Sequence, residues 1–82
     1  MVKVRVRYFG AHRDIVGTAE EMVDVPEGAT VANLVERILT DHPDLEDLRG
    51  DTVVSVNRGL GNADLVLEDD DDVALFPPIS GG

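Results

Sequence analysis

The sequence ends in Asp72-Val73-Ala74-Leu75-Phe76-Pro77-Pro78-Ile79-Ser80-Gly81-Gly82, and this stretch decides the fold prediction. Its first part alternates in polarity and predicts a strand over residues 73–76. The two prolines cannot continue the hydrogen bonding of a sheet and favour an extended backbone. The last two residues have no side chains, so the terminal carboxylate can enter a narrow active site in which a Cβ would clash.

The residues before this stretch predict four further strands. Val2, Val4, Val6 and Tyr8 alternate with basic residues, which is typical of a strand with one apolar face. Shorter apolar segments predict strands at 21–25, 52–57 and 65–67, the last of them at an edge. The intervening segments predict a short helix or irregular turn at 10–16, a loop or short turn at 44–51, and a turn at 58–62.

One main helix is predicted after Thr30, whose hydroxyl suits an N-cap. The apolar residues that follow recur at helical spacing and form one continuous stripe: Val31, Leu34, Val35, Ile38 and Leu39. The helix ends near Pro43, which cannot continue it. In the next segment, Leu45 and Leu48 are the expected core plugs.

The predicted order, β-β-α-β-β-β, places one apolar helix stripe against one sheet, which makes a two-layer α+β domain. The first two strands are expected to pair as an antiparallel hairpin. The last strand is expected to lie centrally beside the first, because Val73 and Leu75 must be buried. The domain covers residues 1–76, and a flexible tail follows: Pro77, Pro78, Ile79, Ser80, Gly81 and Gly82.

Length and composition limit the possible functions. The 82 residues make one domain, and they include no cysteine, so disulfides, thiolate metal sites and a thiol nucleophile are excluded. No apolar run approaches the ~20 residues of a membrane span, and the N-terminus lacks the pattern of a signal peptide. We therefore expect a cytoplasmic protein that does not act at a membrane.

Charge is the second strong signal. The sequence holds 17 acidic and 7 basic residues, for a net charge of −10, which disfavours nucleic acid as a partner. Lys3 is the only lysine. An ordered domain this acidic is typical of a salt-loving organism, because concentrated salt screens its self-repulsion. The alternative is an acidic surface that meets one basic partner.

With these elements in place, the chain resembles the β-grasp, ubiquitin-like sulfur carriers of the MoaD/ThiS family and the small archaeal ubiquitin-like modifiers. The carrying segments are residues 2–9, Arg13-Asp14-Ile15-Val16-Gly17, Thr30-Val31, Val54-Ser55-Val56-Asn57 and, most specifically, residues 72–82. The resemblance implies a β-grasp fold with a mixed sheet of four to five strands. One departure is the acidic run at 68–72, where the family places a Gly-Asp turn.

The resemblance also implies the chemistry of Gly82. A carboxylate is a poor acyl donor until ATP converts it to an adenylate, whose AMP leaves readily. The sequence has no Walker-type loop and no catalytic constellation, so the chain is not expected to be an enzyme or to bind a cofactor. ATP and Mg²⁺ are expected on a partner adenylating enzyme of the ubiquitin-activating type.

Three functions remain open at this point. A sulfur carrier would hold a thiocarboxylate at Gly82 and deliver sulfur for molybdopterin synthesis within the large subunit of molybdopterin synthase. A protein modifier would be joined through Gly82 to lysines of target proteins, and Lys3 would be the acceptor for self-conjugation. A β-grasp binding module would have an inert tail. The terminal motif favours the first two functions over the third.

The candidate docking residues lie on the face opposite the core. Since Tyr8 is in phase with the inward valines, Phe9 shares the outer face with Arg5 and Arg7. Phe76 is likewise out of phase with the inward residues of the last strand. The two phenylalanines then form an exposed aromatic patch suited to docking; the alternative is that one or both fold into the core.

The remaining polar features predict structure rather than a site. The acidic run at 68–72 lacks the spaced ligand pattern of a calcium loop and predicts a solvated turn. His12 and His42 are isolated in the sequence and do not suggest zinc. Asn57-Arg58-Gly59 predicts a turn, with Arg58 free to pair with an acidic partner.

Overall fold

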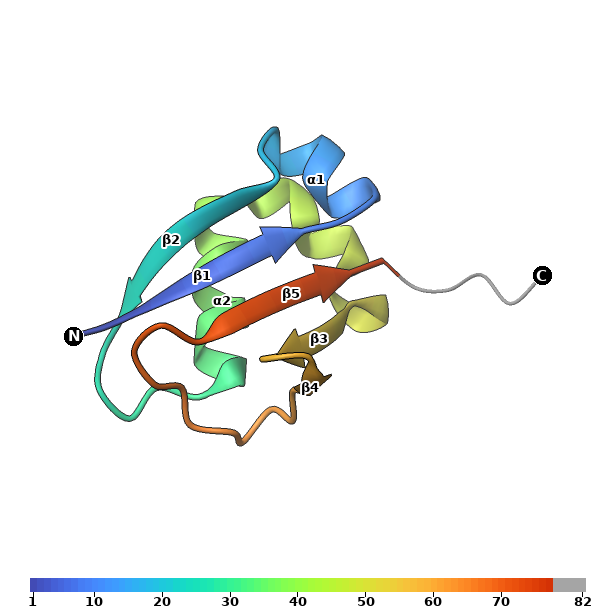
Figure 1. Cartoon of the computed structure of the whole chain (residues 1–82). Helices are drawn as coiled ribbons and strands as arrows, with labels where there is room; N and C mark the ends of the chain where they lie inside the picture. The colour runs from blue at the N-terminus through green and yellow to red at the C-terminus, as the bar shows by residue number, and fades with distance from the viewer. Residues whose placement is uncertain (78–82) are drawn as a thin grey trace.

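The last strand, β5 (Asp72–Phe76), lies at the centre of a five-stranded mixed sheet (Figure 1). The computed structural model describes residues 1–77 of the chain. The other elements are β1 (Val2–Tyr8), α1 (Ala11–Val16), β2 (Glu20–Val25), α2 (Val31–Asp41), η1 (Pro43–Asp51), β3 (Val53–Val56) and β4 (Gly59–Leu60). The strand order in the sheet is β2-β1-β5-β3-β4. The predicted α+β, β-grasp architecture is confirmed.

The central position of β5 follows from its neighbours. It pairs in parallel with β1, with Val6 opposite Val73 and Tyr8 opposite Leu75, and it pairs antiparallel with β3. Val73 and Leu75 are at most 3% exposed, as the sequence predicts for a central strand. β2 completes the predicted antiparallel hairpin with β1.

The main helix, α2, covers one face of the sheet (Figure 1). Thr30 caps it in a reciprocal capping box with Asn33. The helix buries Val31, Leu34 and Ile38 against the sheet, and these residues join one hydrophobic core with the inward residues of β1, β2 and β5. Among the described residues, no helix could cross a membrane.

The predicted turn at 58–62 is wrong, because the chain reverses earlier. Asn57 and Arg58 both have positive φ, 51° and 71°, which gives a two-residue hairpin loop after β3. Gly59 and Leu60 therefore form β4, and the N–H of Gly61 donates to the Val54 carbonyl at 3.0 Å. The turn predicted for Asn57-Arg58-Gly59 does form: Asn57 and Arg58 make its loop, and Gly59 is the first residue of β4.

The predicted edge strand at 65–67 is also wrong. Its backbone contacts the start of α2: the N–H of Val31 donates to the Leu65 carbonyl at 2.9 Å, and the N–H of Leu67 donates to the Ala29 carbonyl at 2.9 Å. A single bridge, Thr30 to Val66, is the remaining sheet-like contact of the segment. The segment completes the cap of a helix instead of extending the sheet.

The segment predicted as a loop or short turn at 44–51 forms the 3₁₀-helix η1. Leu45 is 2% exposed and Leu48 packs against the core, so both leucines contribute to the core as predicted. α1 occupies the segment predicted as a short helix or turn, and it ends at Gly17.

Candidate functional site

The candidate site begins where the described chain ends, at the C-terminal end of β5. The residues predicted to carry the chemistry, Gly82 and the tail from Pro78 to Gly81, lie outside the described residues. Pro77 is described and is half-buried. The structure therefore shows the base of the predicted tail and the surface around it.

Phe9 and Phe76 lie side by side at this base. Their ring centroids are 4.8 Å apart with planes 9° from parallel, and both side chains are just over a third exposed. The parallel register of β1 and β5 brings them together, and the N–H of Phe9 donates to the Leu75 carbonyl at 3.2 Å. The structure thus places both rings on the outer face; their docking role stays a prediction.

Arg7 extends this stack with a fixed charge. Its guanidinium lies 5.8 Å from the centroid of the Phe9 ring, a cation–π contact. It also makes two contacts of 2.9 Å with the carboxylate of Asp72, in a bidentate arrangement. Arg5 pairs with Glu20 at 3.3 Å, but both side chains are more than half exposed and the pair adds little stability.

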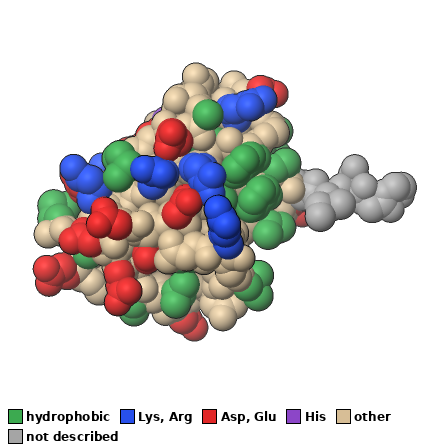
Figure 2. Space-filling model, viewed as in Figure 1, with side chains coloured by type: hydrophobic (Ala, Val, Ile, Leu, Met, Phe, Trp, Pro, Cys, Tyr) green, Lys and Arg blue, Asp and Glu red, His purple; other side chains and the backbone are tan. Residues whose placement is uncertain are grey.

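Two further hydrophobic side chains widen the aromatic surface. Val53 on β3 is opposite Phe76 and is 45% exposed, and Leu60 on β4 is 79% exposed. We call Phe9, Phe76, Val53 and Leu60 the outer-face patch. Figure 2 shows hydrophobic side chains gathered beside the end of the described chain, with basic side chains across the middle of the same face. Val53 and Leu60 were not among the docking residues predicted from the sequence. The alternation along β3 could have indicated Val53, because it points to the face opposite the buried Val56.

The acidic run at 68–72 is an ordered loop. Asp71 is 9% exposed, and its carboxylate accepts from Asn57 Nδ2 at 2.9 Å and from the N–H of Glu68 at 2.8 Å. Asp69 accepts from the N–H of Lys3 at 2.8 Å. The predicted solvated turn is therefore wrong for Asp71, because a carboxylate with two donors tolerates burial. Within residues 1–77, no cluster of His, Asp and Glu is arranged to hold a metal ion.

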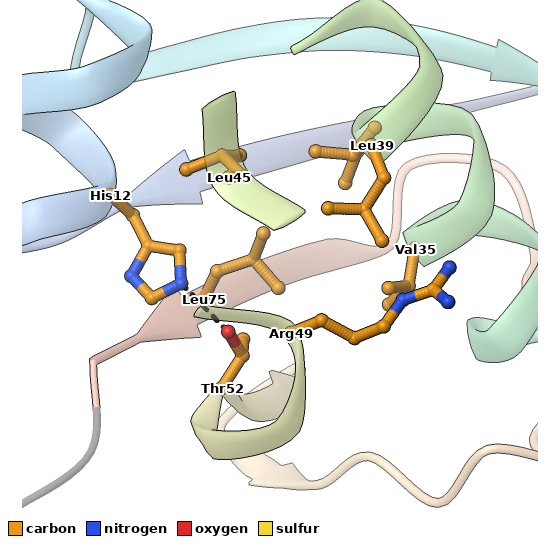
Figure 3. Close-up of a pocket in the computed structure, with 8 residues that line it drawn as sticks. His12, Val35, Leu39, Leu45, Arg49, Thr52 and Leu75 are labelled. Carbon is orange, nitrogen blue, oxygen red and sulfur yellow. Dashed lines mark hydrogen bonds between the residues drawn. The ribbon is translucent and has the colours of Figure 1, made fainter. Parts of the chain in front are cut away.

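His12 is a core residue at 1% exposure. Thr52 Oγ1 donates to the Leu48 carbonyl at 2.7 Å, so it accepts from His12 Nε2 at 2.8 Å. His12 Nδ1 has no hydrogen-bond partner, and burial lowers the pKa of this histidine. Figure 3 shows the ring beside a mainly apolar cavity of about 20 Å³, which is too small for a cofactor.

His42 joins the end of α2 to β2. Its Nε2 lies 3.2 Å from the carboxylate of Glu21, and its ring meets the edge of Tyr8 at a centroid distance of 6.1 Å. Burial raises the pKa of the Tyr8 hydroxyl, and the Glu21 carboxylate adds to that rise. These contacts give His42 a structural role.

A comparison with known families matches residues 6–82 to the ThiS family. The chain is 39% identical over 83 residues to the molybdopterin synthase sulfur carrier subunit of Mycobacterium tuberculosis, covering all of both chains. It is 36% identical over 85 residues to the human molybdopterin synthase sulfur carrier subunit, covering 100% of this chain and 97% of the human one.

Solved structures show the same fold. SAMP1 of Haloferax volcanii superposes with a TM-score of 0.87 at 27% identity, over 98% of this chain and 99% of that one. One chain from the Helicobacter pylori complex of subunits 1 and 2 of molybdopterin-converting factor superposes with a TM-score of 0.72 at 26% identity. The match covers 99% of this chain and 100% of that one. The first of these proteins is a small archaeal modifier, and the second is half of a two-subunit assembly.

Proposed function

Because the chain belongs to the ThiS family, we propose that it is a ubiquitin-like sulfur carrier for molybdopterin biosynthesis. The observation that carries this proposal is the extent of the match, which continues from the domain through Gly82. The relatives at 36% and 39% identity are molybdopterin synthase sulfur carrier subunits, and the match covers 97% and 100% of their chains. The terminal carboxylate is the group that would carry the sulfur.

The chemistry divides between the chain and its partners. The Gly82 carboxylate attacks the α-phosphate of ATP, which forms an acyl-adenylate and releases pyrophosphate. Hydrosulfide supplied by a partner then attacks the carbonyl, AMP leaves with the bonding pair, and loss of the S–H proton leaves a thiocarboxylate. ATP, Mg²⁺ and the catalytic residues belong to an adenylating enzyme of the ubiquitin-activating type. Since this step consumes ATP, we place the protein in the cytoplasm.

The outer-face patch is the proposed docking surface for these partners. Its exposed hydrophobic side chains lie on the same face as Arg5 and Arg7, on a chain whose net charge is −10. Apolar anchors next to cations suit a partner surface with an apolar hollow and an acidic rim. We propose the large subunit of molybdopterin synthase as one such partner, which the Helicobacter pylori two-subunit complex supports.

The test is mass spectrometry of the intact protein purified from its native host. The sulfur carrier predicts a population in which one terminal oxygen is replaced by sulfur, and fragmentation localises that replacement to Gly82. A Gly82 carboxylate that stays unmodified in cells making molybdopterin would contradict the proposal. Loss of the modified population when the host's adenylating enzyme is deleted would identify the activating partner.

A second candidate function is protein modification through Gly82. The likeness to SAMP1 of Haloferax volcanii favours it, and the same adenylate can react with a lysine amine as well as with sulfur. It predicts Gly-Gly remnants on lysines of host proteins after digestion. The third candidate, a β-grasp binding module with an inert tail, predicts neither modification.

A further inference from the structure

Gly10 sits in a position that no other residue type fits, directly after Phe9. Its backbone angles are φ 57° and ψ −128°, a combination open to glycine and closed to residues with a Cβ. A Cβ at this position would also lie 2.9 Å from Cγ of Pro77 and 3.4 Å from its Cδ. Backbone conformation and close approach therefore exclude a side chain independently.

The contact with Pro77 is the last of three that fix the base of the tail. The N–H of Phe9 donates to the Leu75 carbonyl, the Phe9 and Phe76 rings stack, and the Pro77 ring then lies against Gly10. The two segments thus continue side by side for two residues beyond Tyr8 and Leu75, the last pair of the β1–β5 ladder. Two restraints therefore act on the chain direction at Pro77: the proline ring restricts its own φ, and the ring lies against Gly10.

We propose that Gly10 is a positioning residue for the terminal carboxylate. Its bare backbone receives the Pro77 ring and sets the direction in which the chain leaves the domain beside the outer-face patch. This proposal rests on the proposed function, since it concerns delivery of Gly82 to a partner that grips that patch. Gly82 lies five residues beyond Pro77, which is a reach of at most roughly 17 Å, so the direction set at Pro77 limits the region around the domain that the carboxylate can enter.

The sequence offers matched controls for a Gly10→Ala variant. Gly17 and Gly28 also have positive φ, 88° and 84°, but a Cβ at either would have no neighbour within 4 Å. Gly17→Ala and Gly28→Ala therefore introduce backbone strain without disturbing Pro77. A Pro77→Ala variant removes the ring, and the double variant Gly10→Ala with Pro77→Ala removes the clash while the strain at residue 10 remains.

The experiment measures ATP–pyrophosphate exchange with the adenylating enzyme of the same genome, together with melting temperatures and the contact itself. In the wild type, we expect nuclear Overhauser cross-peaks between the Gly10 α-protons and the Pro77 ring protons. Gly10→Ala should lower kcat at least ~10-fold more than either control, because misplacement by 1 Å can cost ~10²-fold in rate. Its KM should stay near the wild-type value, because the outer-face patch is intact. In the Pro77→Ala background, adding Gly10→Ala should cost less than it does in the wild type.

Three results would overturn the proposal. The first is a Gly10→Ala variant with the kcat of the two control variants. The second is an equal cost of Gly10→Ala with and without the Pro77 ring. The third is absence of the cross-peaks, which is decisive even if the wild type supports no exchange and the proposed function itself fails. If Gly10→Ala does not fold, Pro77→Ala alone decides: it should lower kcat with an unchanged melting temperature, and an unchanged kcat contradicts the proposal.

Discussion

Acidification should destabilise the domain through one buried histidine, His12. Its ring is 1% exposed, Nε2 donates to Thr52, and Nδ1 has no acceptor within reach. A second proton would place an unpaired N–H and a positive charge among the apolar residues around the cavity in Figure 3. Burial therefore lowers the pKa of His12 in the folded state.

The sign and size follow from linkage. Because the folded pKa lies below the unfolded value of about 6.5, the unfolded state binds the proton first as the pH falls. The stabilisation is complete above that unfolded value and is lost as the pH falls from it toward the folded pKa. Between pH 8 and pH 5.5 the loss is at most about 1.4 kcal/mol. For a domain of this size, that corresponds to roughly 6–11 °C in melting temperature.

The assay compares wild type with His12→Gln in melts at pH 8 and pH 5.5 in concentrated KCl. Glutamine can still donate to Thr52 but cannot take up a proton in this range. The wild type should lose more stability on acidification than the variant, whatever the stability of the variant at pH 8. Any effect of pH that does not involve residue 12 is common to both proteins and cancels in the difference. Parallel losses in the two proteins would refute the reasoning.

Four further predictions concern the tail, the acidic loop and the charge. Deleting Gly81 and Gly82 should abolish ATP–pyrophosphate exchange and leave the melting temperature unchanged, because the described domain stays whole; normal exchange would make the tail inert. Asp71→Ala should cost about 3 kcal/mol or more in urea unfolding, since it removes two hydrogen bonds to a charged group of about 1.5–3 kcal/mol each, whereas exposed Asp64→Ala should cost under ~0.5 kcal/mol. The melting temperature should be lower in dilute buffer than in concentrated KCl, and equal values would contradict the halophilic interpretation of a net charge of −10. Lys3→Arg keeps the charge and should confine self-conjugates to the α-amine of Met1, as peptide mapping would show; conjugates elsewhere would contradict it.

The parts of the fold that sequence could predict are those with a local pattern. The alternation of β1 and the apolar stripe of α2 are periodic over several residues, and both elements form where the patterns predict them. β4 has two residues, too few for a periodicity, and it depends on positive φ at Asn57 and Arg58. Leu65-Val66-Leu67 has the composition of a strand, but its backbone pairs with the distant start of α2. Local composition does not identify that partner.

The candidate site shows the same division. The outward direction of Phe9 and Phe76 follows from counting along each strand. Their stacking, and the contact between Gly10 and Pro77, depend on the parallel register of β1 and β5, which joins residues more than 60 positions apart. In the acidic loop, the sequence does not distinguish the five acidic residues from one another, but the fold does. Asp71 is buried, and Asp70 has a left-handed φ of 69°. A glycine would adopt that conformation freely, which reconciles this loop with the Gly-Asp turn of the family.

The position of β5 explains how a small domain can present its end to another protein without unfolding. The proposed function requires a partner to draw the tail into its active site, and that pull would reach the domain through β5. β5 is hydrogen-bonded to β1 on one side and to β3 on the other, so two ladders share the pull. At the opposite end of the strand, Asp72 is held by Arg7 and by the side chain of Asn57, which accepts from the Asp72 N–H at 2.9 Å. An edge strand would resist the same pull with one ladder instead of two. A central final strand therefore suits a protein whose chemistry takes place beyond its last strand.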